Sequence, residues 1–294
     1  AFDPRVGFVK CASLATAAAL GLINATAAAV YMGVDDAHLG ANATSRDSVR
    51  IESRATFSSG LFVLSLSHIP TGCGVWPAFW MTGTGDAWPM WGEWDIVEGF
   101  DRQSQVFSSI HTTSNCSEAS VGDADFSGSW VLGNRSATTD CSVAHGNPQD
   151  GCSQKGPNAT LGAQFNAGGG GTYAAEWTSS GLSIWFWQAG AEPADLAARA
   201  PEPRSWGTPY SFFALGPGSC DPSHFRDMRI VFDLDLGGTC VNHLYGPKNA
   251  QSFHGSCPHI IETCPEFIKT NAKALAEAYW IVTALDVYSN SSAV

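Results

Sequence analysis

Residues 91–99 read Trp91-Gly92-Glu93-Trp94-Asp95-Ile96-Val97-Glu98-Gly99. Side chains alternate between the two faces of a β-strand, so Glu93 and Asp95 share one face and Trp94 takes the other. In a regular strand Glu98 would face the core beside Trp94. An ionised carboxylate without a partner is costly there, so a regular strand is a poor interpretation of this segment.

A β-bulge near Ile96 and Val97 resolves the conflict, because it absorbs one residue and returns Glu98 to the face of Glu93. Glycosidases that retain configuration need two carboxyl groups about 5 Å apart. Asp95 would lie between them, where like charges raise pKa values and keep a proton donor protonated. The spacing therefore predicts a glycosidase site on a bulged strand, and an acidic edge strand is the alternative.

Tryptophan is concentrated around this segment, at Trp76, Trp80, Trp88, Trp91 and Trp94. Indoles stack on the apolar faces of sugar rings and offer an N–H to their hydroxyl groups. Alternation places Trp76 and Trp80 together on one face of their strand. Trp94 is assigned to the core, Trp91 could lie on either side, and core filling is the alternative for any single Trp.

The segment from Val106 to Thr113 is predicted to return as a strand beside the carboxylate strand. His111 would then lie near the acids. A lone His is more often structural, but the short return favours a hydrogen-bonding role in the site.

Beyond these motifs, nearly the whole chain resembles glycoside hydrolase family 16, specifically the fungal laminarinase-like endo-β-1,3(4)-glucanases. The matching segments are Gly7–Val9, Asp47–Ser53, His68–Trp80, Gly92–Gly99, Ile110–Thr112, Trp206–Pro209, Ser223–Phe225, Ile230–Leu234 and Ala278–Trp280. The resemblance implies a β-jelly roll of two curved antiparallel sheets with the substrate across a concave cleft. The Glu-x-Asp-x-x-Glu form is typical of the laminarinase-like branch, whereas Trp94 departs from the small aliphatic residue usual there.

Carried over by motif, Glu93 resembles the nucleophile, Asp95 the assisting carboxylate and Glu98 the general acid and base. The resemblance also implies that five residues line the sugar subsites, namely Arg50, Trp76, Trp80, Trp88 and His111. Arg50 alternates with Val49 and Ile51, which agrees with a polar cleft face over an apolar core face.

The 294 residues, 44% of them hydrophobic, can bury the core of one catalytic domain over residues 1–294. Short strand patterns between Gly-, Ser- and Pro-rich turns favour an all-β fold. We expect strands at 48–57, 60–67, 172–177, 182–187, 229–236 and 280–288. A short helix is expected at 272–277, and small-residue strands and turns at 12–34.

Nine cysteines without a repeated Cys-x-x-Cys unit favour disulfides over a zinc site. The odd count leaves at least one cysteine unpaired within the chain, for which Cys11 and Cys73 are the candidates. Residues 115–156 are expected to form a long disulfide-tethered loop, and residues 237–265 show little regular pattern. Six Asn-x-Ser/Thr sequons, at Asn24, Asn42, Asn115, Asn134, Asn158 and Asn290, are compatible with a glycosylated secreted protein.

A net charge of −12 argues against nucleic-acid binding, because phosphate backbones are met by basic patches. We expect a secreted monomer, with its signal peptide removed, that acts on a β-glucan without a membrane, a cofactor or a catalytic metal. A non-catalytic glucan-binding protein and a cell-wall transglycosylase are the alternatives. The presence of all three acids argues against a non-catalytic protein. The acceptor of the transferred sugar, which is water or a sugar hydroxyl, would distinguish a hydrolase from a transglycosylase.

Overall fold

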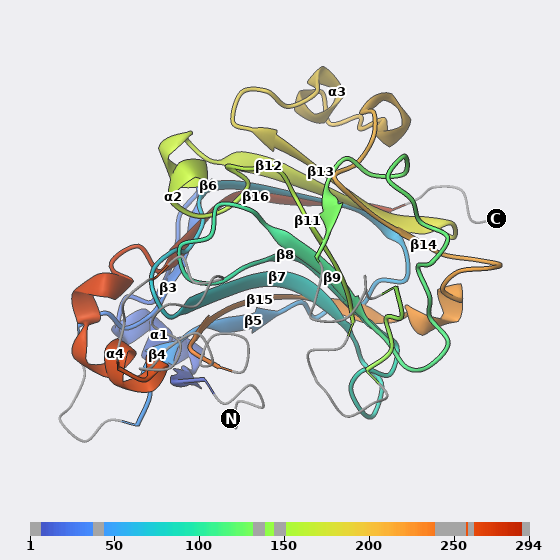
Figure 1. Cartoon of the computed structure of the whole chain (residues 1–294). Coiled ribbons are helices and arrows are strands. Elements are labelled where there is room, and N and C mark those ends of the chain that lie inside the picture. Colours follow the sequence, from blue (N-terminus) through green and yellow to red (C-terminus); the bar gives the residue numbers. More distant parts are fainter. Residues whose placement is uncertain are drawn as a thin grey trace.

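Two large antiparallel sheets form most of the computed structural model, which describes residues 7–37, 44–131, 139–143, 151–238, 257 and 262–289. In spatial order, the first sheet contains β10 (Ser129–Trp130), β11 (Cys152–Lys155), β9 (Phe107–His111), β8 (Glu93–Glu98), β7 (Val75–Gly83), β15 (Met228–Leu236) and β5 (Arg50–Glu52). The second contains β14 (Ser211–Ala214), β13 (Gly181–Gln188), β12 (Gly171–Trp177), β6 (Gly60–His68), β16 (Tyr279–Tyr288), β3 (Val30–Gly33) and β2 (Ile23–Ala25). The two sheets are curved and lie one over the other (Figure 1), so the all-β prediction is confirmed.

Helices are short and lie outside the two sheets. The α-helices are α1 (Leu14–Ala19), α2 (Gly162–Ala167), α3 (Ala194–Ala197) and α4 (Cys264–Thr270), and the 3₁₀ helices are η1 (Pro203–Ser205), η2 (Pro222–His224) and η4 (Ala272–Leu275). In the described part of the chain, β1 (Val9–Cys11) and β4 (Arg46–Ser48) also form a parallel pair. Figure 1 shows α1, α4 and β4 at one end of the sandwich.

Five of the six predicted strands are confirmed, as β6, β12, β13, β15 and β16. The sixth prediction, residues 48–57, is only partly correct because β5 covers Arg50–Glu52. The backbone leaves the ladder after β5 and returns at an isolated bridge between Phe57 and Met228. The expected core position of Ile51 is wrong, since Ile51 is 36% exposed at the edge of the sheet, whereas Val49 is buried.

The small-residue segment near the N-terminus contains a helix that was not expected. Ser13 caps α1 by accepting a hydrogen bond from the Thr16 amide, and four of the six residues of the helix are alanine. Alanine has the highest helix propensity, which explains why strands and turns are an incomplete prediction here. The helix expected at 272–277 is a 3₁₀ helix. Among the described residues, no helix combines the length and the apolar character that a membrane span requires.

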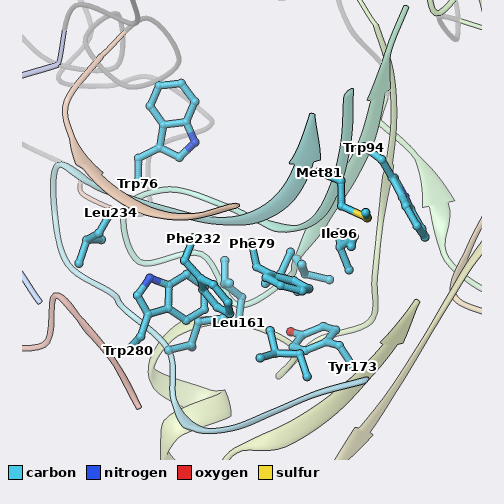
Figure 2. Close-up of a cluster of buried hydrophobic side chains, with 14 of the residues drawn as sticks. Trp76, Phe79, Met81, Trp94, Ile96, Leu161, Tyr173, Phe232, Leu234 and Trp280 are labelled. Atoms are coloured by element: carbon cyan, nitrogen blue, oxygen red, sulfur yellow. The ribbon is translucent and has the colours of Figure 1, made fainter. Parts of the chain in front are cut away.

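The core lies between the sheets and is rich in aromatic rings. Phe79, Phe232 and Trp280 pack in sequence, with ring centroids 4.7 and 5.7 Å apart. Trp94 is fully buried, as predicted. Figure 2 shows Trp76 on one side of the strand ribbon and Phe79, Phe232 and Trp280 on the other. The core therefore holds one face of β7, while the other face of the same strand carries Trp76.

Among the described residues there are three disulfides, of which Cys73–Cys257 and Cys116–Cys220 join segments 184 and 104 residues apart, while Cys141–Cys152 closes a short loop of separation 11. The expectation that Cys73 is unpaired is therefore wrong, and Cys264 is a buried free thiol. Two of the bonds tether the long loop expected at 115–156, but this segment also contains β10 and β11, which extend the first sheet. Most of the segment 237–265 lies outside the described residues, and its described end begins α4.

Candidate active site

The bulge predicted in the carboxylate strand is present in β8. Against β7, Trp80 pairs with Asp95 and Phe79 pairs with Val97, so Ile96 has no opposite residue. The register against β9 shifts over the same residues, between Asp95 and Glu98. The extra residue lets consecutive side chains of Ile96 and Val97 both be fully buried. The prediction of a bulge at this place is confirmed.

Indole N–H groups bond the first and the last acid of the strand. Trp88 Nε1 donates to Glu93 Oε2 at 2.8 Å, and Trp76 Nε1 donates to Glu98 Oε1 at 2.9 Å. Trp88 is 47% exposed, so its ring remains available to a ligand, whereas Trp76 is buried. Two of the three Trp residues predicted for the site, Trp76 and Trp88, therefore contact the acids of β8 directly.

His111 lies opposite Glu93 in the β8–β9 ladder, as the predicted return strand requires. Its Nε2 is 3.2 Å from Asp95 Oδ2 and 3.9 Å from Glu93 Oε1. The His111 ring is also 6.0 Å from the ring of Trp88. His111 thus lies within hydrogen-bonding distance of Asp95, next to the acids as predicted.

Burial and mutual repulsion shift the titration of two of the acids. Burial, followed by the charge of Glu93, raises the pKa of Asp95 to about 6, and the contacts with His111 oppose this. Burial, followed by the charge of Asp95, raises the pKa of Glu98 to about 7, and the hydrogen bond from Trp76 opposes it. Glu98 can therefore hold a proton in mildly acidic solution, which a general acid must do.

A fourth carboxylate, Asp233 on β15, holds two further predicted site residues. Its Oδ2 accepts hydrogen bonds from Trp80 Nε1 at 3.2 Å and from Arg50 Nη1 at 3.3 Å. The Arg50 guanidinium lies 5.0 Å from the centroid of the Trp80 ring. Asp233 is not among the residues that the sequence predicts for the site. Its signal is a charged residue in the otherwise apolar alternation of Ile230–Leu234.

The turn that enters β8 needs a glycine. Gly92 has φ +77°, and a Cβ there would lie 2.7 Å from the His224 carbonyl oxygen and 2.6 Å from the Phe225 ring. Trp91, whose side was left open by the sequence, has φ +65° and lies under the Arg226 guanidinium, 4.5 Å from its ring centroid. Trp91 therefore packs against Arg226.

Two groups of described residues bring possible metal ligands within 4.8 Å of one another. The first is Glu93, Asp95 and His111. The second contains Cys116 and Cys220, whose sulfurs form a disulfide and so cannot be thiolate ligands. The first group has the donor types that suit a transition metal. The prediction that catalysis uses no metal stays a prediction.

A sandwich of two antiparallel sheets, with carboxylates and indoles gathered on one outer face, is the arrangement of a glycoside hydrolase of the jelly-roll type. The family comparison agrees with this class. Residues 1–288 match the XgeA-like catalytic domain of glycoside hydrolase family 16, and the chain belongs to this family.

Relatives extend over almost the whole chain. A probable endo-1,3(4)-β-glucanase of Aspergillus clavatus is 34% identical over 295 aligned residues, which cover 99% of this chain and 44% of that protein. An endo-1,3(4)-β-glucanase of Arthroderma benhamiae is 36% identical, with 99% of this chain and 61% of that protein covered. This chain thus spans about half the length of the curated relatives that it matches.

Solved structures agree with the fold. Laminarinase 16A from Phanerochaete chrysosporium, solved with β-glucans in donor and acceptor sites, has a TM-score of 0.84 at 33% identity. An elongating family 16 β-1,3-glucosyltransferase has a TM-score of 0.84 at 34% identity. Each match covers 98% of this chain and 92% of the other chain.

Proposed function

We propose that this chain is a retaining endo-glucanase that hydrolyses β-1,3 linkages, and β-1,4 linkages next to β-1,3 units, in β-glucans. The observation that carries the proposal is the pair of acids on bulged β8. Glu93 accepts an indole hydrogen bond, while Glu98 is held in an environment that raises its pKa. Family membership and the names of the relatives support the same substrate class.

In the first step, Glu93 attacks the anomeric carbon while the Glu98 carboxylic acid protonates the leaving glycosidic oxygen. The bond to the leaving sugar breaks, and a glycosyl ester forms on Glu93. Asp95, held by His111, stays close to both acids, so its charge disfavours ionisation of Glu98 before the proton is transferred.

In the second step, the Glu98 carboxylate removes a proton from water, which attacks the same anomeric carbon and releases Glu93. Two displacements restore the original configuration. The exposed indole of Trp88 would stack on a sugar ring, and Trp80 and Arg50 would line an adjoining subsite, where Arg50 would donate to sugar hydroxyl groups.

The direct test is the release of reducing ends from laminarin, with NMR of the first product anomer to establish retention. Replacing Glu93 by Gln should reduce hydrolysis at least 1,000-fold, on the order expected for loss of a nucleophile, and leave oligosaccharide binding. Glu202→Gln, a change at an exposed residue that precedes η1 and lies outside β8, is the matched control. Normal turnover by the Glu93 variant would refute the assignment.

Azide separates the roles of the two acids. A small anion can replace the missing nucleophile in Glu93→Gly and give an α-glycosyl azide, whereas in Glu98→Ala it should accelerate release of the intermediate and give a β-glycosyl azide. If both variants gave the same anomer, or if neither responded to azide, Glu93 and Glu98 would not have the roles proposed here.

Transfer to a sugar hydroxyl is the second candidate activity, and the 34% identity to an elongating glucosyltransferase favours testing it. Mass analysis of products formed with excess laminari-oligosaccharide acceptor separates the two outcomes, because transfer lengthens chains and hydrolysis shortens them. Parallel digests of laminarin, lichenan and a branched β-1,3/1,6-glucan would define the linkage preference.

We also propose that the protein is secreted, glycosylated and monomeric. Asn24, Asn115 and Asn158 are exposed, so these sequons are accessible to glycosylation, and the three disulfides are typical of an oxidising compartment. Mass spectrometry of protein from culture medium, before and after removal of N-glycans, tests the first two statements, and light scattering tests the third.

A further inference from the structure

One cross-strand row joins the proposed proton donor to a carboxylate outside the three-acid motif. Glu98 on β8 lies opposite Ala78 on β7, Ala78 lies opposite Asp233 on β15, and Asp233 lies opposite Arg50 on β5. Residues in such a row point to the same face of the sheet. The side chain between Glu98 and Asp233 in this row is therefore a single methyl group.

Asp233 lies beneath the surface on which a glucan would bind. It is 2% exposed, so it is a poor candidate for direct contact with a substrate. One of its oxygens nevertheless accepts hydrogen bonds from both Trp80 and Arg50, whose own side chains are 5.0 Å apart from guanidinium to ring centroid. A single buried carboxylate thus fixes the orientation of an indole and of a guanidinium.

We propose that Asp233 is a positioning residue of this site, which fixes Trp80 and Arg50 for sugar binding and sets the electrostatic environment of Glu98. The inference rests on the proposed function, because it takes Glu98 as the proton donor. The residue acts through its neighbours and takes no part in bond making.

The charges around Asp233 define the expected direction of its effect. It raises the pKa of Glu98 and of Asp95, after the larger contributions of burial and of the neighbouring acids. The charged groups that face this region are Arg50 and Glu52 on β5, Glu93, Asp95 and Glu98 on β8, His111 on β9 and Asp235 on β15. Arg50 offsets part of the charge of Asp233, so removing that charge leaves a smaller effect than an isolated carboxylate would have.

The size of the effect follows from the spacing of the strands. Two strand spacings separate Glu98 from Asp233 by about 10 Å, and a unit charge at that distance shifts a pKa by about 0.6–1.2 units for an effective dielectric constant of about 20–40. Allowing for Arg50, the variant Asp233→Asn should lower the pKa of Glu98 by about 0.5–1 unit.

The first experiment measures this shift without substrate. Carboxyl ¹³C NMR titration of Glu98 in the wild type and in Asp233→Asn should show the lower pKa, and the alkaline limb of the kcat/KM profile should move to lower pH by the same amount. Asp195→Asn is the matched control, because Asp195 also accepts an indole hydrogen bond, from Trp206 at 2.7 Å. An unchanged Glu98 titration in the folded Asp233→Asn variant would overturn the electrostatic part of the proposal.

The second experiment tests the positioning of Trp80. Asp233→Ala and Trp80→Phe should each raise KM for a laminari-oligosaccharide about tenfold, with a smaller change in kcat, because each removes the same indole–carboxylate bond. The double variant should then be no worse than about the poorer single variant. Additive losses would overturn the positioning role, and if Asp233→Ala does not fold, the same cycle is run with Asp233→Val, which also lacks the acceptor oxygen, and Trp80→Phe.

Failure of the proposed function would look different. If the wild type released no sugar from any β-glucan, the glucanase assignment would fall. The NMR titration would still decide whether Asp233 controls Glu98, and tryptophan fluorescence on addition of oligosaccharide would still report its effect on binding.

Discussion

The hydrogen bond from Trp76 to Glu98 should set the upper pH limit of activity. Trp76 Nε1 lies 2.9 Å from Glu98 Oε1, and this bond lowers a pKa that burial raises to about 7. Trp76→Phe keeps an aromatic ring but removes the donor. The Glu98 carboxylate then loses a stabilising partner, so its pKa must rise further.

The magnitude follows from the strength of such bonds. A hydrogen bond to a charged group contributes about 1.5–3 kcal/mol, and part of this persists for the protonated acid, which leaves a difference of about 1–1.5 kcal/mol. One pKa unit corresponds to about 1.4 kcal/mol. Since Glu98 must be protonated to act as an acid, the alkaline limb of kcat/KM should move up by about one pH unit.

The assay measures the initial rate of hydrolysis of a reduced laminari-oligosaccharide at constant ionic strength. The pH is varied from about 4 to about 9 in steps of about half a unit. Trp206→Phe serves as control, because it removes an indole donor bonded to Asp195 in another part of the chain. A limb that stays in place, or moves down, in a folded Trp76→Phe variant would refute the reasoning. Asp233→Asn should move the same alkaline limb to lower pH. Opposite shifts in the two variants would therefore show that both act on the pKa of Glu98.

Three further predictions concern stability and binding. Burial raises the pKa of Glu118 to about 8, above its unfolded value. The free energy of unfolding should therefore decrease by about 3–5 kcal/mol as the pH rises from about 4.5 to 8. Urea unfolding of Glu118→Gln should show a much smaller decrease over the same pH range. Replacing Cys73 and Cys257 by Ala should cost about 2–5 kcal/mol, since that bond spans 184 residues. Arg50→Lys should raise KM about three- to tenfold, because Lys cannot keep both bonds of the guanidinium to Glu52. An unchanged value in any of these measurements would contradict the corresponding argument.

Local patterns were sufficient where the physical rule itself is local. Alternation along a strand is a property of the backbone, so three acids with one extra residue between them predicted a bulge without knowledge of the partners. The same rule placed Trp94 in the core and Trp76 on one face of its strand together with Trp80. Alternation failed for Ile51, because exposure at the edge of a sheet depends on what lies beyond it.

Contacts between distant segments were beyond such patterns. Asp233 reaches Trp80 across 153 residues of sequence, and Cys73 reaches Cys257 across 184. A charged residue in an apolar segment marks Asp233 as unusual but does not identify Trp80 as its partner, and any pair among the nine cysteines would satisfy the local pattern. The short α1 helix, by contrast, had a local signal in Ser13 and the alanines that follow.

What the sequence by itself determined is the chemistry of one strand and the all-β class: which acids share a face, where the bulge falls and which indoles are near. The tertiary structure alone decided how those acids titrate and what holds their neighbours. Burial of Glu98 and Asp95 raises their pKa values, and Asp233 joins Trp80 to Arg50. Desolvation and charge act through space, so they depend on the packing of strands that are remote in the chain.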